Sequence, residues 1–398
     1  MPVAVYLLAL AVFAQGTSEF MLSGLLPAIA ADLHVSLSQA GLLTSAFAAG
    51  MIVGAPLLGV LSLRWPPRTA LLAFLSVFIA AHIVAALGDD YPLLLACRVA
   101  GALANAGFLA VALVSATTMA APGATARTTS VLLGGVTVAC VAGVPAGALL
   151  GQLWGWRAAF WAVVLVSLPA LAAIVAKVPG GGGRPAARAL GEFRALGERT
   201  LLATLVTGAL VNAATFATFT YLASMITGVS GLPGGWIPAV LALFGAGSFA
   251  GVTMAGRWAD RRPVLLTAGG GALLLTGWTC FALLAGLPYV ALVLVAVQGA
   301  LSFMVGSALI AQALNAAGRA PRLGGAFATA ALNVGAALGP WAGGAAIEAG
   351  LGLRAPLWVS AALVAAALAV AACARLWSRT TAGAALSDRS TGPAPGPR

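Results

Sequence analysis

Residues 92–119 read Pro-Leu-Leu-Leu-Ala-Cys-Arg98-Val-Ala-Gly-Ala-Leu-Ala-Asn105-Ala-Gly-Phe-Leu-Ala-Val-Ala-Leu-Val-Ser-Ala-Thr-Thr-Met119, a run with a single charge, at Arg98. An α-helix needs about 20 consecutive apolar residues to cross the hydrocarbon core of a bilayer. The run therefore predicts a membrane-spanning helix. A charge at that depth is costly in lipid, so Arg98 is expected to face the protein interior or a water-filled cavity.

Apolar stretches of similar length recur along the whole chain. Only 7% of the 398 residues are charged and 61% are hydrophobic, whereas soluble proteins carry about 25% charged residues. The composition excludes a water-soluble globular protein and predicts an all-α integral membrane protein with about twelve transmembrane helices. The other stretches lie near residues 4–28, 40–62, 69–87, 130–151, 158–177, 200–226, 236–256, 264–286, 289–315, 324–347 and 356–376.

The first of these stretches could be mistaken for a signal peptide. It lacks a basic segment at its start, contains Glu19, and continues to Pro27 without a convincing cleavage site. We therefore interpret it as a retained first helix.

The distribution of charge predicts one orientation in the membrane. With the N-terminus inside, every Lys and Arg except Arg98, Arg157 and Arg354 falls on the cytoplasmic side. This bias follows the positive-inside rule and places both termini in the cytoplasm of a multi-pass protein of a bacterial cell membrane. The net charge of +11 thus sets topology, and we expect a lipid bilayer rather than nucleic acid as its partner.

The two halves of the sequence resemble one another. Gly155-Trp-Arg157 matches Gly352-Leu-Arg354, and Arg64 pairs with Arg261 at the same spacing. We predict two pseudo-symmetric six-helix bundles at residues 1–178 and 200–377, a cytoplasmic linker at 179–199, and a disordered cytoplasmic tail at 378–398. Since six spans separate the copies, the repeat is parallel, an arrangement that places a substrate site between the halves near the bilayer midplane.

Two charged residues within spans are candidates for proton coupling. Glu19 lies midway along the first span, where burial favours its protonated form. Arg98 keeps its charge and needs an acidic or carbonyl partner. Asn105 lies on the same helix face as Arg98 and is a candidate substrate contact. The alternatives are a structural hydrogen-bonded network for Glu19 and a snorkelling role for Arg98.

Further candidate substrate contacts form a polar and aromatic stripe on the seventh span, at Asn212, Phe216 and Phe219. Gln298 and Asn333 add buried amides on the tenth and eleventh spans. Aromatic faces and amides suit a neutral, amphipathic organic molecule. Ordinary helix packing is an equally good interpretation of each residue taken alone.

Small residues and prolines mark candidate hinges on the fifth and eleventh spans, at Gly143, Pro145, Gly147, Gly339 and Pro340. Small residues allow close helix approach, and proline allows a bend. We interpret these residues as hinge and packing elements between the halves.

The loop after the eighth span carries Asp260 and Arg261, which could pair with neighbouring helix ends and hold one conformation. The alternative for the arginines of this loop is a plain positive-inside anchor.

The remaining chemistry-bearing residues predict no catalytic or metal site. The four cysteines lie in apolar segments, and His34 and His82 are isolated, which favours solvated or packed histidines. No phosphate-binding Walker sequence and no nucleophile–base pair occurs. We therefore expect a protein that is not an enzyme and that uses no cofactor or metal.

The motifs resemble the major facilitator superfamily, specifically its twelve-span drug:proton antiporter branch. The segment from Gly16 to Pro27 resembles the first-helix motif of that branch, Arg98…Gly101 its fourth-helix motif, and Gly143…Gly147 its fifth-helix motif with Val144 interrupting the usual Gly-Pro pair. In the loop motif after the second span, Leu63 replaces the usual aspartate, whereas the second-half copy keeps Asp260.

Within this branch, segments such as Arg64-Trp-Pro-Pro-Arg68 are similar to those of actinomycete chloramphenicol-resistance exporters. The resemblance implies proton-coupled efflux of chloramphenicol or related phenicols by alternating access, driven by the proton gradient in a functional monomer. An exporter of sugars, purine nucleosides or a broader set of drugs is the alternative on the same fold. A solute importer and a membrane receptor are alternatives of other classes.

Overall fold

The computed structural model describes residues 3–62, 65–119, 125–178, 199–258, 261–316 and 321–390. Within this part of the chain, 11 helices are long and apolar enough to span a membrane. The helix α14 (Pro321–Ala346) occupies the remaining predicted span. The prediction of an all-α membrane protein with about twelve spans is therefore confirmed.

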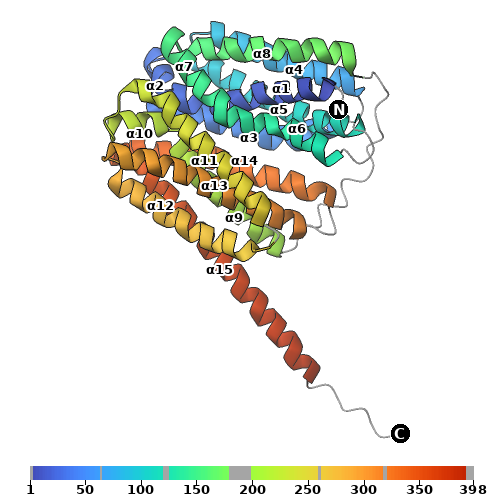
Figure 1. Ribbon diagram of the computed structural model, residues 1–398, viewed down its shortest axis with the longest axis vertical. Coiled ribbons are helices and arrows are strands. Elements are labelled where there is room, and N and C mark those ends of the chain that lie inside the picture. The colour runs from blue at the N-terminus through green and yellow to red at the C-terminus, as the bar shows by residue number, and fades with distance from the viewer. Residues whose placement is uncertain are drawn as a thin grey trace.

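The N-terminal half is a bundle of six spans, the upper, blue-to-green part of Figure 1. Two of its spans are built from more than one helical segment. Its elements are α1 (Val3–Phe20), α2 (Leu22–Asp32), α3 (Leu37–Leu61), α4 (Pro67–Leu87), α5 (Tyr91–Thr118), α6 (Thr125–Val138), the π-helix η2 (Ala139–Gly143), α7 (Val144–Trp154) and α8 (Trp156–Lys177).

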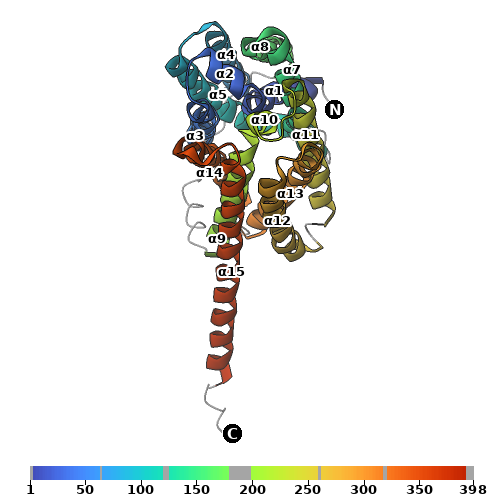
Figure 2. The same ribbon diagram turned by 90° about the vertical axis from the view of Figure 1, so that its left-hand side faces the viewer.

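The C-terminal half is the second bundle, coloured from green to red, and it lies below the first in Figure 1. Figure 2 shows the same division from the side. Its elements are α9 (Arg199–Phe219), α10 (Leu222–Gly228), the 3₁₀ turn η4 (Gly234–Trp236), α11 (Ile237–Trp258), the π-helix η5 (Leu265–Gly269), α12 (Gly270–Leu284), α13 (Pro288–Ala316), α14, the π-helix η6 (Ile347–Leu351) and α15 (Ala355–Ser390).

The backbone repeats between the halves as the sequence does. Gly155 and Gly352 both have a positive φ, of 82° and 76°, and lie one and three residues before the last helix of their half. Glycine adopts this left-handed conformation without the steric cost that a Cβ adds. The first span of each half is also broken at a matching place, after Phe20 and after Phe219.

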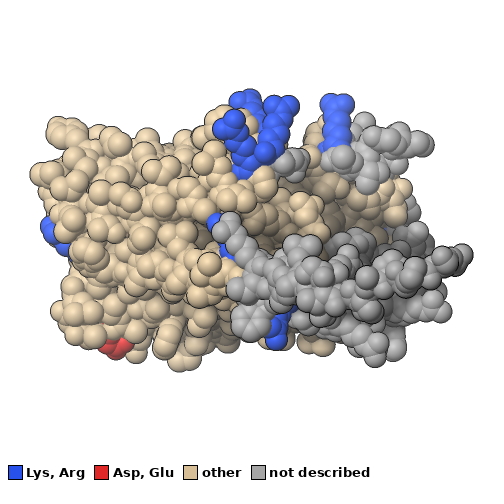
Figure 3. All heavy atoms as spheres, turned by 90° about the horizontal axis from the view of Figure 1, so that it is seen from below, with Lys and Arg blue, Asp and Glu red and all other residues tan. Residues whose placement is uncertain are grey.

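The two ends of the bundle differ in charge. The basic end carries Arg68, Arg127, Lys177, Arg199, Arg257, Arg261, Arg262 and Arg375, all at or near helix termini. The opposite, acidic end carries Asp32, Asp89, Asp90 and Glu348 together with Arg157 and Arg354. In Figure 3 most of the Lys and Arg side chains in view lie at the upper centre and toward the right, whereas the acidic patch in view lies at the lower left.

The halves contact one another at the acidic end. Gln152 at the end of α7 donates a hydrogen bond to the carbonyl of Gly234 across the interface at 2.6 Å. Nearby, α2 packs on α10, and a Cβ on Gly24 would collide with Leu241 of α11. The two bundles are thus closed against each other at this end.

The structure describes the predicted disordered tail only up to residue 390, and that part is helical. Helix α15 continues to Ser390, so residues 378–390 lengthen the helix of the last span. Residues 391–398 lie outside the described residues. This segment contains three alanines, at 382, 384 and 385, and alanine has the highest helix propensity. Figure 1 shows the helix projecting beyond the bundle.

Candidate functional site

Glu19 lies in the last turn of α1, just before the chain breaks at Met21 and restarts as α2. Its side chain is partly exposed. Among the described residues, no donor makes a hydrogen bond to its carboxylate and no cation lies within ion-pair distance, so the Arg98 guanidinium acts on it only through space. A carboxylate within a span that has neither a hydrogen-bond donor nor an ion pair can exchange a proton without first breaking a salt bridge.

Arg98 lies behind Glu19 and is only 2% exposed. Its Nη1 donates to the carbonyl of Ser18 at 2.9 Å and to the Ser18 hydroxyl at 3.1 Å. Its guanidinium also sits over the Phe47 ring, 4.3 Å from the centroid. Arg98 therefore does not snorkel to the headgroups, and its partner is the residue next to Glu19.

His82 completes this buried network. It lies in α4, is 3% exposed, and accepts or donates at both ring nitrogens. Nδ1 is 2.7 Å from the carbonyl of Phe78, and Nε2 is 2.6 Å from the Ser18 hydroxyl. Of the two histidines, His34 is exposed as a solvated residue, whereas His82 is packed.

A row of aromatic rings starts beside Glu19 and crosses into the C-terminal half. Phe20 lies 5.8 Å from Phe216, centroid to centroid. Phe216 contacts Phe219 at 6.2 Å, and Phe219 contacts Phe244 of α11 at 4.6 Å. Phe303 of α13 ends the row, 6.3 Å from Phe244. The predicted stripe on α9 thus lies at the junction of the two bundles.

Three residues of this row were missed by the sequence analysis: Phe20, Phe244 and Phe303. Phe20 could have been found, because it follows Glu19 directly and lies within the first-helix motif. Phe244 and Phe303 are isolated aromatics in long apolar helices, and no periodic pattern distinguishes them from packing residues.

The predicted amides are not brought together. Asn212 donates to the carbonyl of Leu332 in α14 at 2.6 Å, and Asn333 donates to Thr329 of its own helix at 3.0 Å. Gln298 is fully buried and faces α12, where it donates to the Leu274 carbonyl at 3.2 Å. A substrate-contact role for Gln298 does not fit this position. Asn105 is 5% exposed on α5.

The small residues predicted as hinges pack inside each half rather than between the halves. A Cβ on Gly143 would strike Thr17 of α1, and one on Gly147 would lie 3.2 Å from the Met21 Cβ. Gly339 of α14 likewise lies against the backbone of α9 at Ala213 and Ala217. The reason is that each seam joins the first and fifth spans of one bundle, which small residues allow to approach closely.

The two prolines lie at irregular points of these same helices. Pro145 cannot donate to the carbonyl of Val141, and the preceding turn widens into the π-helix η2. Pro340 lies inside α14, and its carbonyl accepts a hydrogen bond from the Tyr221 hydroxyl at 2.8 Å. A hinge function of these elements remains a prediction.

The loop residues give less information. Asp260, Leu63 and Arg64 lie outside the described residues. Arg261 is exposed at the basic end. In the part of the chain that the structure covers, no cluster of three or more His, Cys, Asp or Glu could hold a metal ion.

Comparisons with known proteins agree with this architecture. The family model of the Major Facilitator Superfamily matches residues 8–331. A chloramphenicol resistance protein of Streptomyces lividans is 54% identical over 93% of this chain and 96% of its own length. The inner membrane transport protein YdhP of Escherichia coli is 32% identical, covering 87% of this chain and 89% of its own.

The fold also matches a solved structure. A bacterial homolog of the human lysosomal transporter Spinster, in an inward-facing and unoccupied conformation, aligns with a TM-score of 0.72. The alignment covers 94% of this chain and 95% of that one, at 18% sequence identity. With a family model that spans most of the sequence and a fold built of two six-span bundles, the chain belongs to the major facilitator superfamily of membrane transporters.

Proposed function

We propose that this chain exports chloramphenicol or a related phenicol from the bacterial cytoplasm in exchange for protons. The observation that carries the proposal is the position of Glu19, which has no hydrogen-bond donor among the described residues and directly precedes Phe20, the first ring of an aromatic row shared by both bundles. The 54% identity to a chloramphenicol resistance protein supports the choice of substrate. The basic end faces the cytoplasm in this proposal, in keeping with the positive-inside rule.

The proposed cycle uses one site that is exposed alternately to the two sides. Drug enters from the cytoplasm while Glu19 is ionised. The drug rests against the aromatic faces of Phe20, Phe216 and Phe219. The bundles then tilt, a proton from outside neutralises Glu19, and the drug leaves. The protonated protein returns inward and releases that proton to the more alkaline cytoplasm.

The energy available from one proton is sufficient for this work. Moving one elementary charge through a membrane potential yields about 2.3 kcal/mol per 100 mV. A tenfold concentration ratio of a neutral drug requires about 1.4 kcal/mol. Exchange of one proton for one drug molecule therefore sustains more than tenfold accumulation outside.

His82 acts in this proposal as a positioning residue for Arg98. Because the Phe78 carbonyl only accepts, Nδ1 carries the proton, and neutral Nε2 then accepts from the Ser18 hydroxyl. The Ser18 oxygen is left to accept from Arg98. Donors therefore run in one direction from Arg98 through Ser18 to His82. This chain of bonds holds the guanidinium on Ser18 and away from an ion pair with Glu19.

The test is expression in a drug-sensitive host, with an empty vector as control. Chloramphenicol, florfenicol and a structurally unrelated drug are each tested, and cellular drug content is measured with and without a protonophore. We expect lower cellular content and resistance to the phenicols, both abolished by the protonophore. A rise in cellular content would indicate import, and efflux that survives the protonophore would contradict proton coupling.

A further inference from the structure

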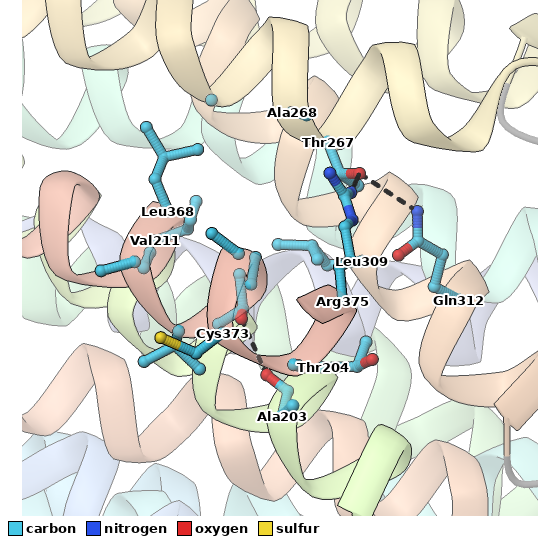
Figure 4. Close-up of a pocket in the computed structure, with 18 of the residues that line it drawn as sticks. Ala203, Thr204, Val211, Thr267, Ala268, Leu309, Gln312, Leu368, Cys373 and Arg375 are labelled. Carbon is cyan, nitrogen blue, oxygen red and sulfur yellow. Dashed lines mark hydrogen bonds between the residues drawn. The ribbon is translucent and has the colours of Figure 1, made fainter. Parts of the chain in front are cut away.

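A cavity of about 1020 Å³ lies inside the C-terminal half, at the basic end. Its walls come from the first half of α9, the junction of η5 with α12, the end of α13 and the middle of α15. Figure 4 shows the lining side chains between these helices. Arg199 and Arg375 of this lining belong to the basic end, so the cavity opens where the bilayer meets water.

The cavity is separate from the transport site. Helices α12 and α15 pack on one another and on other elements of their own half. In Figure 1 both lie on the side of the C-terminal bundle away from the N-terminal bundle. The aromatic row and Glu19 lie at the junction of the bundles, so a molecule in this cavity would meet neither.

Polar donors converge at one side of the cavity. Arg375 Nη2 lies 3.4 Å from the Thr267 hydroxyl. The amide of Gln312 donates to the Pro263 carbonyl at 3.2 Å and to the same hydroxyl at 3.4 Å. Figure 4 shows the Arg375 and Gln312 side chains directed toward Thr267. Arg199 adds a second guanidinium to the lining.

The rest of the lining is apolar. Val211, Val305, Leu309, Val364 and Leu368 form the walls farther along the helices from the basic end. A row of threonines on α9 directs its hydroxyls to its own backbone, as Thr207 does to Ala203 at 2.7 Å. The cavity therefore has a cationic, hydrogen-bonding mouth and a hydrocarbon-like depth.

We propose that this cavity binds an anionic phospholipid of the cytoplasmic leaflet, with its phosphate at Arg375 and Gln312 and part of an acyl chain along Leu309 and Leu368. Basic pockets between transmembrane helices on the cytoplasmic side are suited to anionic lipid headgroups. The volume is at the upper end of the roughly 300–1,000 Å³ of small-molecule sites, which leaves room for a headgroup and the start of a chain.

Cys373 lines the cavity and gives a direct measure of occupancy. With Cys97, Cys140 and Cys280 replaced by alanine, the full chain is reconstituted in vesicles of phosphatidylcholine, with or without phosphatidylglycerol. The rate of alkylation by N-ethylmaleimide is then measured. We expect slower alkylation of Cys373 when phosphatidylglycerol is present. Trp258→Cys, in a chain without other cysteines, reports the general effect of an anionic surface at the same end.

Three arginine variants locate the effect. Arg375→Gln is expected to weaken the protection about fivefold, which corresponds to about 1 kcal/mol for one basic residue near an anionic surface. Arg257→Gln removes a charge from the same end outside the cavity and is expected to retain the protection. Arg375→Lys, which keeps the charge, should restore most of it and shows that the loss is not misfolding.

Two further outcomes would overturn the proposal. Equal protection of Cys373 and of the cysteine at position 258 would show a surface effect without a site. Protection by glycerol 3-phosphate or inorganic phosphate in phosphatidylcholine vesicles, as complete as that by phosphatidylglycerol, would assign the cavity to a soluble anion. Because phenicol transport is not measured, these results do not depend on the proposed function.

Discussion

At the scale of single residues, hydrogen bonds hold one of the two charged groups inside the N-terminal bundle and leave the other without a donor. Arg98 is held by Ser18, its guanidinium covers Phe47, and His82 fixes the Ser18 hydroxyl. Glu19 has no such partner among the described residues. The carboxylate can therefore change its protonation state while the surrounding network stays intact.

Replacing His82 tests this division directly. His82→Leu removes the acceptor for the Ser18 hydroxyl, so we expect Arg98 to move more freely and to pair with Glu19. This pairing would favour the ionised form of the Glu19 carboxyl group. Drug transport by purified protein in vesicles should then shift its pH optimum to lower pH. His82→Gln can donate to Phe78 and accept from Ser18, and it should restore the original pH profile. A loss of rate without any shift in profile would indicate a purely structural role.

The acidic end offers a second titratable residue, Asp32, outside the spans. Hydrogen bonds from Trp156 at 3.0 Å and from Arg157 at 2.5 Å hold the pKa of the Asp32 carboxyl below its usual value. Because the folded-state pKa is lowered, the stabilisation is present above the ordinary aspartate pKa. It is lost as pH falls through the lowered value.

Asp32→Asn should therefore lower the thermal unfolding temperature at neutral pH but not at strongly acidic pH. The Asp32 side chain is 45% exposed, and exposed pairs contribute roughly 0.2–1 kcal/mol. The difference is expected to be small and to shrink in high salt. Asp90→Asn, at the same end, serves as the control. An equal effect of Asp32→Asn at all pH values would contradict the ion-pair assignment.

At the scale of elements, close helix approaches explain where glycine is required. A Cβ on Gly245 of α11 would collide with the backbone of η2 at Cys140 and lie 2.9 Å from the Val141 Cα. This contact joins the two halves. In contrast, nothing lies within 4 Å of a Cβ on Gly256 of the same helix.

Gly245→Ala is therefore expected to separate the halves at this point and to slow transport severalfold. The unfolding free energy should fall by about 1–3 kcal/mol, the usual range for overpacking. Gly256→Ala should change neither property appreciably. Thermal unfolding and vesicle transport assays compare the two variants, and equal behaviour of both would show that α11 and η2 are not in tight contact.

Much of the element order could be predicted from sequence, because length and apolarity define a span. The sequence also predicted the repeat, because the segments that begin at Gly155 and Gly352 resemble one another. In the structure both glycines have a positive φ. The direction in which a buried side chain points could not be predicted. Gln298 and Phe216 both lie on apolar helices, yet Gln298 faces α12 and Phe216 faces Phe20. Helix periodicity places residues on a common face but does not identify the neighbouring helix.

At the scale of the whole molecule, the separation of charge predicts its orientation. The basic end should face the cytoplasm and the acidic end, where the halves are closed, the outside. In a chain without native cysteines, Asp90→Cys should react with a membrane-impermeant maleimide added to intact cells. Arg257→Cys should react only after the cells are opened. The reverse pattern would overturn the orientation and with it the direction of the proposed cycle.

The fold alone does not supply proton coupling, the role that we propose for Glu19. In vesicles whose lumen is more acidic than the bath, the native chain should accumulate chloramphenicol against its concentration gradient. Glu19→Gln should lose this accumulation while it still exchanges labelled for unlabelled drug, because the amide resembles the protonated acid. Accumulation by Glu19→Gln at the native level would contradict the account.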